Sequence, residues 1–151
     1  MSRFLALASI VLLASCAIED RTPAGSRADE AEIRSVVASY YRGVDARALE
    51  PVRGLLWDSL QVITAESGVW RSIRGADAWV DSLAARRAAL PAGLASVETL
   101  RFDVRQDGDI AAVWTVLRGA AGARVDHVLL ARSRDGWRIV GVASAPRRGP
   151  D

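Results

Sequence analysis

Two adjacent residues near the C-terminus carry the side chains best suited to acid–base chemistry. Asp126 is followed directly by His127, the only histidine of the chain. Imidazole has an ordinary pKa of about 6.5, so it can take up and release a proton near neutral pH. Both residues lie in an alternating apolar stretch, Val125–Ala131, which predicts a strand. Neighbours on a strand point to opposite faces, so at most one of the pair faces a shared pocket. The simpler role of either residue is to face solvent or to bond a cross-strand partner.

A pair of tyrosines, Tyr40 and Tyr41, is the second candidate for a polar site. Both lie on the apolar stripe of a predicted helix, where core packing is the simplest role. A buried tyrosine still needs a hydrogen-bond partner for its hydroxyl group, so one of the two is expected to point into a cavity.

The tryptophans are most simply core and rim residues, and Trp114 fits a pocket wall and a dimer face equally well. The predicted ligand pocket comprises aromatic and polar side chains: Tyr40, Tyr41, Trp57, Thr64, Trp79, Trp114 and His127. One histidine, one cysteine and scattered acids are too few ligands for a metal. The sequence therefore predicts no metal site and no cofactor.

The single cysteine, Cys16, ends a segment typical of protein export. Met1–Arg3 is positively charged, and Phe4–Leu13 is apolar but too short to span a bilayer permanently. Leu13-Ala14-Ser15-Cys16 resembles the lipobox of bacterial lipoproteins. That motif implies removal of residues 1–15 and acylation of Cys16, which would anchor the protein in a membrane. The alternative is an ordinary cleaved signal with an incidental cysteine.

The rest of the chain then divides into three parts: a flexible tether (16–28), one folded domain (29–146) and a disordered tail (147–151). The anchored domain would face the periplasm or the exterior. Ala17 after the cysteine, rather than an aspartate, favours the outer membrane where the host has one. The chain is 50% hydrophobic with a net charge of +2, which excludes a disordered chain and a basic nucleic-acid-binding domain.

Period-2 alternation predicts an antiparallel meander in the C-terminal third, with turns at Gln106–Asp109 and Arg134–Gly136. The predicted strands are Leu100–Val104, Ile110–Leu117, Val125–Ala131 and Trp137–Val142. Upstream, 3.6-residue periodicity predicts an amphipathic helix capped at Asp29, a short helix over Leu49–Trp57 and a third helix from Gly75. Gln61–Thr64 and Gly68–Ile73 predict a hairpin, and Leu90–Gly93 ends the third helix. Helices segregated from strands indicate an α+β fold.

The order of these elements resembles the nuclear transport factor 2-like superfamily, which includes ketosteroid isomerase and scytalone dehydratase. The resemblance is carried by Tyr40–Asp45, Leu55–Asp58, Gly75–Ala78 and Val125–Val140, and the last stretch resembles most a bacterial branch described as putative lumazine-binding. It implies a cone in which N-terminal helices pack on the concave face of a strongly curved antiparallel sheet.

The isomerases of this superfamily use a tyrosine on the first helix, an aspartate base on the first strand and a protonated aspartic acid on a later strand. The resemblance places Tyr40 at the tyrosine, Asp126 at the acid and Thr64 at the base. A threonine cannot take up a proton near neutral pH, which argues against the isomerase reaction.

The sequence thus favours a lipid-anchored protein that binds a small apolar or amphipathic molecule, or an envelope partner, without catalysis. The alternative is an isomerase- or dehydratase-like enzyme that uses His127 or Asp126 together with Tyr40. A third interpretation is an interaction subunit whose pocket is filled by its own side chains. Relatives of this fold often dimerise through the convex face of the sheet, so we also expect a weak homodimer, with Thr115 and Leu117 on that face.

Overall fold

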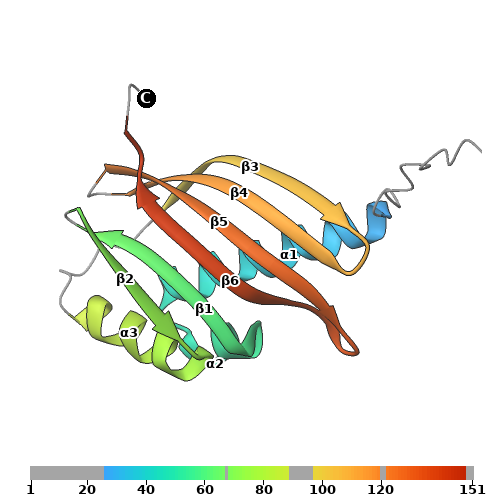
Figure 1. Cartoon of the computed structure of the whole chain (residues 1–151), viewed down its shortest axis with the longest axis horizontal. Helices are drawn as coiled ribbons and strands as arrows, with labels where there is room; N and C mark the ends of the chain where they lie inside the picture. The colour runs from blue at the N-terminus through green and yellow to red at the C-terminus, as the bar shows by residue number, and fades with distance from the viewer. Residues whose placement is uncertain (1–25, 67, 89–96, 120–121, 149–151) are drawn as a thin grey trace, which may run out of the picture.

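The computed structural model describes residues 26–66, 68–88, 97–119 and 122–148, which form three helices and six strands (Figure 1). The helices are α1 (Arg27–Ala46), α2 (Leu49–Gly54) and α3 (Ala76–Ala88). The strands are β1 (Leu56–Glu66), β2 (Val69–Arg74), β3 (Glu98–Asp107), β4 (Ile110–Gly119), β5 (Gly122–Ser133) and β6 (Gly136–Pro146). None of these three helices is long and apolar enough to cross a membrane. The predicted lipobox at Leu13–Cys16, residues 1–15 and the expected helix end at Leu90–Gly93 lie outside the described residues.

The six strands form one curled sheet in the order β2-β1-β6-β5-β4-β3. Strands β3 to β6 pair in sequence as an antiparallel meander, which confirms the prediction from the alternating pattern. The curved sheet is antiparallel at every pairing but one, since β1 runs parallel to β6. That pairing attaches the β1–β2 hairpin to the free edge of β6.

Glycines at positive φ form the two turns of the meander that the sequence indicated. Gly108 has a φ of 57° between β3 and β4, and Gly136 has a φ of 112° between β5 and β6. These backbone conformations are costly for residues with a Cβ atom. The turns fix the register that places each inward residue beside its neighbours.

Helix α1 begins two residues earlier than the domain boundary expected at Asp29. Its N-cap is Ser26, whose hydroxyl accepts a hydrogen bond from the Asp29 backbone N–H at 3.1 Å, so Asp29 is not the cap. The apolar stripe that predicted the helix is buried at Ile33, Val37 and Tyr41.

Helix α2 is shorter than expected and β1 is longer. The helix ends at Gly54, and the chain is extended from Leu56 onward, so Trp57 belongs to β1. Alternate residues of this strand, including Leu60 and Val62, are buried. Strand β1 therefore begins at Leu56, before the predicted Gln61, while its regular alternation of buried residues begins at Leu60.

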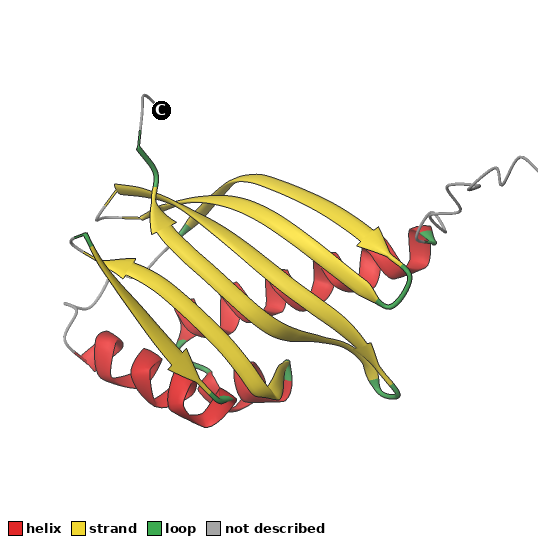
Figure 2. Cartoon of the chain, viewed as in Figure 1, coloured by secondary structure: helices red, strands yellow, loops and turns green. Residues whose placement is uncertain are grey.

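The core lies between the helices and one face of the sheet, which we call the inner face. Helix α1 runs along this face, and α2 and α3 lie near β1 and β2 (Figure 2). Thr115 and Leu117 are both 0% exposed within the core. The expectation that they form an outward dimer face is therefore wrong, since their parity on β4 points them toward α1.

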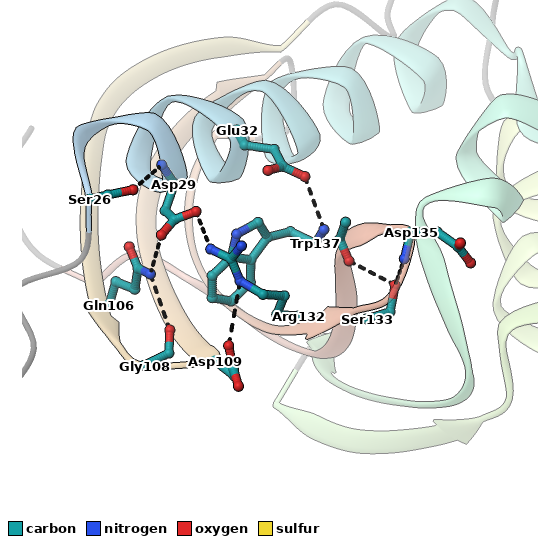
Figure 3. Close-up of polar contacts among 11 residues, drawn as sticks. Ser26, Asp29, Glu32, Gln106, Gly108, Asp109, Arg132, Ser133, Asp135 and Trp137 are labelled. Carbon is teal, nitrogen blue, oxygen red and sulfur yellow. Dashed lines mark hydrogen bonds and ion pairs between the residues drawn. The ribbon is translucent and has the colours of Figure 1, made fainter.

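Side chains of the first two turns of α1 bind residues of β3, β5 and β6 (Figure 3). The Asp29 carboxylate accepts hydrogen bonds from Arg132 on β5 and from Gln106 on β3. Glu32 accepts the backbone N–H of Trp137 at 3.2 Å. These contacts fix one end of the helix, and thereby the position of the tyrosines further along it.

Candidate functional site

Four polar side chains form a row across the inner face of the sheet. Thr115 on β4 pairs with Asp126 on β5, Asp126 with Ser144 on β6, and Ser144 with Thr64 on β1. Thr115 is 0%, Asp126 2% and Thr64 4% exposed. Each residue lies at an inward position of its strand, so the register alone gathers them. A buried polar row of this kind is the chemically distinctive feature of the core.

Tyr41 on helix α1 contacts two residues of this polar row. The Tyr41 hydroxyl donates to Oδ2 of Asp126 at 3.0 Å and shares a second hydrogen bond with the Thr115 hydroxyl at 2.9 Å. The Ser144 hydroxyl donates to the other oxygen, Oδ1, at 2.6 Å. Arg124 Nε lies 3.4 Å from Oδ1, close enough for charge attraction although it is not aligned as a hydrogen bond. Both carboxylate oxygens are thus occupied by groups of the protein. We call these five residues (Tyr41, Thr115, Arg124, Asp126 and Ser144) the Asp126 cluster.

The tyrosine that meets Asp126 is Tyr41, whereas the resemblance assigned this place to Tyr40. The Tyr40 hydroxyl instead accepts a hydrogen bond from Trp79 Nε1 on α3 at 3.0 Å. The two rings pack edge to face with centroids 5.2 Å apart. Successive helical residues point about 100° apart, so only one of the two hydroxyls can reach β5.

Both tyrosines keep their protons under physiological conditions. Burial raises the pKa of Tyr41 far above its ordinary value of about 10, and the neighbouring charge of Asp126 raises it further. Burial also raises the pKa of Tyr40, although the hydrogen bond from Trp79 opposes part of that effect. The raised pKa keeps the Tyr41 hydroxyl protonated, so it can donate its hydrogen bond to Asp126.

Thr64 occupies the place that the resemblance assigns to a catalytic base. Its hydroxyl oxygen is buried and has no hydrogen-bond partner among the described residues. A hydroxyl group in this position can accept or donate a hydrogen bond to a ligand but cannot abstract a proton near neutral pH.

His127 and Trp114 lie on the opposite, outer face of the sheet. The two residues are cross-strand partners, and their ring centroids are 6.4 Å apart. His127 is exposed, and the guanidinium of Arg101 lies 4.4 Å from the Trp114 ring centroid. The prediction that His127 and Trp114 line an inner pocket is therefore wrong, because strand alternation turns both side chains away from the face that carries Asp126. Trp57 is half-buried in β1.

A groove with a volume of about 560 Å³ opens between β2 and α3. Its described lining residues are Arg71, Ser72, Ile73, Ser82, Ala85 and Arg86. Arg71 pairs with Thr64 across the β1–β2 ladder, so the groove lies at the edge of the same inner face. Among the described residues, no member of the Asp126 cluster lines it.

The sequence interpretation missed Ser144, Thr115 and the groove arginines as site residues. The sequence did carry a signal for them in the alternation of the strands. The inward positions of these strands are otherwise apolar, and a polar residue interrupts them at Thr64, Thr115, Asp126 and Ser144. The cation Arg71 at an inward position of β2 was a signal of the same kind.

Comparisons with known proteins support the family and the fold. The model of the putative lumazine-binding family matches residues 28–143, whereas a search of curated proteins gives no match. A nuclear transport factor 2-like protein of unknown function from Pseudomonas putida superimposes with a TM-score of 0.70 at 16% identity, over 80% of this chain and 87% of that chain. A putative ketosteroid isomerase from Shewanella frigidimarina gives a TM-score of 0.61 at 20% identity, over 73% and 91% of the two chains. A putative dehydratase of the same structural family from Streptomyces avermitilis gives 0.65 at 17% identity, over 81% and 98%. At these identities the likeness shows a shared fold.

Proposed function

Because this chain belongs to the putative lumazine-binding family of the nuclear transport factor 2-like superfamily, we propose that it binds a small amphipathic molecule and catalyses no reaction. The family and the fold support a ligand-binding or isomerase-like domain, and the name of the family is no evidence for lumazine. The choice between binder and enzyme rests on the residues of the inner face.

The observation that carries the proposal is the hydrogen bond from Tyr41 to Asp126. In the isomerases the corresponding tyrosine and acid donate hydrogen bonds to the enolate that forms during the reaction. Here Tyr41 donates to the carboxylate itself, and Ser144 occupies the other oxygen. Thr64 stands where the base would be. This arrangement favours a structural role for the Asp126 cluster.

The alternative, an isomerase- or dehydratase-like enzyme, requires a proton acceptor on the inner face. His127 has the right chemistry, but its side chain is exposed on the outer face. The cone-shaped relatives include proteins whose descriptions name isomerase and dehydratase activities. Asp126 together with a tyrosine is what this alternative would use.

The test combines a ligand search with a search for turnover. Native mass spectrometry of the full chain, purified in detergent from its own host, is expected to show a retained small molecule. Enolisable ketones and dehydratable hydroxy-ketones are expected to stay unchanged when mixed with the same preparation. A positioned general base contributes about 10²–10⁴ in rate, so turnover lost in Asp126→Asn or His127→Ala would establish the enzyme instead.

We also propose that Cys16 is acylated and holds the domain at the cell envelope. The support is the lipobox-like Leu13–Cys16 and the position of the only cysteine within it. The domain would face the periplasm or the exterior, at the outer membrane where the host has one.

A homodimer stays a prediction, and its proposed surface moves to the outer face of the sheet. The large apolar side chains Ile63, Leu129 and Ile110 are 39%, 51% and 62% exposed there. They flank the Trp114–His127 pair through the registers of β1, β5 and β4. A second copy would cover them.

A further inference from the structure

We propose that the free edge of β2 binds an extended, acidic segment of a partner protein, which joins the sheet as an additional antiparallel strand. This inference goes beyond the proposed binding of a small molecule and does not involve the Asp126 cluster. It is carried by the backbone and the side chains of β2, the strand at one end of the sheet order.

The backbone of β2 offers hydrogen-bonding groups along its outer edge. The Gly75 N–H donates to the Leu60 carbonyl of β1 at 2.8 Å. Because bonded and outward groups alternate along an antiparallel strand, the N–H and C=O groups of Trp70, Ser72 and Arg74 point away from β1. Among the described residues, these outward groups have no hydrogen-bond partner. They can therefore form the ladder of an added strand.

The opposite edge of the sheet, β3, is protected in ways that β2 is not. Nη1 of Arg34 on α1 donates to the Phe102 carbonyl of β3 at 3.4 Å, and the same guanidinium lies 5.2 Å from the Phe102 ring centroid. The pairing of β3 with β4 also shifts register between Thr99 and Arg101, and such bulges hinder the addition of a strand. The pairing of β2 with β1 is regular. Of the two edges, β2 is therefore the open one.

The side chains of β2 define which strand would fit. Val69 and Trp70 are 57% and 64% exposed, so apolar residues opposite them would remove them from water. Arg71 and Arg74 have no ion-pair partner among the described residues. A carboxylate directly opposite an arginine on a neighbouring strand is stabilising, whereas a like charge is destabilising. The two arginines would therefore reject a basic strand and select an acidic one.

The groove between β2 and α3 would receive one side of the added strand. Arg71 and Ile73 point to the inner face, because they pair with the buried residues Thr64 and Val62 of β1. Both line the groove together with Ala85 of α3. Alternate side chains of the added strand would lie along this groove. In strand addition the backbone bonds supply affinity, and contacts of this kind supply specificity.

Antiparallel addition, the more stable arrangement per residue, specifies a six-residue pattern. Opposite Arg74 back to Val69, the pattern is acidic, apolar, polar, acidic, apolar and apolar. The peptide Glu-Val-Thr-Glu-Ile-Val satisfies it and is the probe. Three further peptides carry Gln in place of both Glu residues, Lys in place of both, or Pro in place of Thr.

Each fluorescently labelled peptide is titrated into the full chain in a non-ionic detergent, with fluorescence anisotropy as the readout. Ser72→Pro removes one outward N–H and leaves the ladder to β1 in place, whereas Ser72→Ala keeps that N–H. Circular dichroism checks that both variants are folded. Arg71→Gln and Arg74→Gln test the charge pairs, and Arg134→Gln, in the exposed turn before β6, is their matched control.

The acidic peptide is expected to bind the native chain, Ser72→Ala and Arg134→Gln with similar affinity. Each of the other two arginine variants should lose about two- to fivefold, as cross-strand charge pairs do. The Lys and Pro peptides should bind at least about tenfold more weakly, and Ser72→Pro should weaken binding by a similar factor.

Hydrogen exchange followed by NMR tests the geometry without any variant. Saturating acidic peptide should slow exchange at the N–H groups of Trp70, Ser72 and Arg74 and change it less at Arg71 and Ile73, whose N–H groups already bond β1. Unchanged exchange at the three outward groups would overturn the proposal.

The remaining outcomes also decide. Equal affinity for the acidic and Lys peptides would overturn the acidic partner, and binding that survives Ser72→Pro, or is lost equally in Ser72→Ala, would overturn strand addition. A native dimer that Ser72→Pro converts to monomer in sedimentation would show that a second copy occupies the edge instead. Retention of a small molecule by the native chain is independent of all these results, so the proposed binding function is tested separately.

Discussion

Asp126 is a charged residue that the fold can bury only because its partners come from three separate elements. Burying an unpaired carboxylate costs several kcal/mol, on the order that single domains have in total stability. Tyr41 from α1, Ser144 from β6 and Arg124 from β5 share that cost between them. The hydrogen bonds of the Asp126 cluster can therefore form only when α1 is correctly packed on the sheet.

Removing the Tyr41 hydroxyl should destabilise the protein measurably. Tyr41→Phe leaves Oδ2 of Asp126 without its donor and removes the hydrogen bond to Thr115. A hydrogen bond to a charged group is worth about 1.5–3 kcal/mol, so we expect a loss of about that size in the free energy of unfolding, measured in urea. His127→Ala, on the exposed face, is the control and should change it by less than about 0.5 kcal/mol. Equal small effects of the two changes would mean that the cluster contributes nothing to folding.

At the residue scale, several members of the site could be predicted from the sequence, whereas their hydrogen-bond partners could not. Asp126 was a candidate for its acid–base chemistry, Tyr41 for its place on the apolar stripe of the first helix, and Thr64 through the family resemblance. Which tyrosine meets the carboxylate could not be predicted, because it depends on how α1 is rotated over the sheet. Ser144 was missed because a serine near the end of a strand looks like any solvent-facing residue.

Among the elements, α1 depends on a salt bridge far from the candidate site. Its first turn is held by Asp29, which pairs with Arg132 and accepts from Gln106, while Arg132 also stacks on Trp137 with 5.0 Å to the ring centroid. Together with the hydrogen bond from the Trp137 N–H to Glu32, these contacts join the helix to β3, β5 and β6 (Figure 3). The hydrogen bond from Arg132 is the main cause that lowers the pKa of Asp29 to about 2.

This lowered pKa makes a prediction about stability in acid. The folded-state pKa of Asp29 lies below the unfolded value of about 3.9, so its contribution is present above about pH 4 and is lost as pH falls toward 2. Asp29→Asn should lower the free energy of unfolding at neutral pH, and its difference from the native chain should shrink toward zero near pH 2. Arg132→Gln should lose the pH-dependent part of its difference over the same range and keep a constant part, because it also removes the stack on Trp137. A difference that is constant from pH 7 to about pH 2 would contradict the assignment.

Close packing between α1 and α2 gives a second prediction at the element scale. A Cβ atom at Gly43 would lie 2.5 Å from Cγ2 of Val52 and 3.3 Å from the carbonyl oxygen of Ala48. Gly43→Ala should therefore destabilise the fold by about 1–3 kcal/mol, as overpacking does, measured by thermal or urea unfolding. Gly54→Ala is the control, because a Cβ there meets nothing within 4 Å. Val52→Ala combined with Gly43→Ala should recover part of the loss.

The elements themselves were largely predictable and their long-range pairing was not. Local alternation and Asp-Gly turns determine the four-stranded meander. The parallel pairing of β1 with β6 joins segments separated by most of the domain, and no local pattern encodes it. The early start of β1 was hidden because its first residues fit a helical pattern as well as an alternating one.

For the whole molecule, the curl of the sheet separates two faces with different chemistry. Register shifts within β5–β6 and β3–β4 increase the local twist and bend the sheet around α1. The inner face holds the Asp126 cluster, and its edge at β2 opens into the groove. The outer face presents apolar and aromatic side chains. Ligand binding and self-association are thus proposed for opposite sides of one sheet.

The length of chain between Cys16 and helix α1 limits how far an anchored domain could lie from a membrane. Helix α1 begins at Arg27 with its cap at Ser26, so ten residue steps separate the cap from Cys16. A fully extended chain of that length spans at most about 35 Å. An acylated Cys16 would therefore keep the groove within a few tens of ångströms of the bilayer surface.

The last prediction concerns this anchor. Acyl chains contribute about 0.8 kcal/mol for each buried methylene group, and more than one chain on a residue gives stable membrane attachment. Cys16→Ser removes the only thiol that can be acylated, so the protein should leave the membrane fraction or accumulate as an uncleaved precursor. Cell fractionation with intact-mass measurement checks both results, and Ser15→Ala, which keeps a small residue before the cysteine, should behave as the native chain does. A Cys16→Ser protein that stays in the membrane at the mature mass would show that the anchor lies elsewhere.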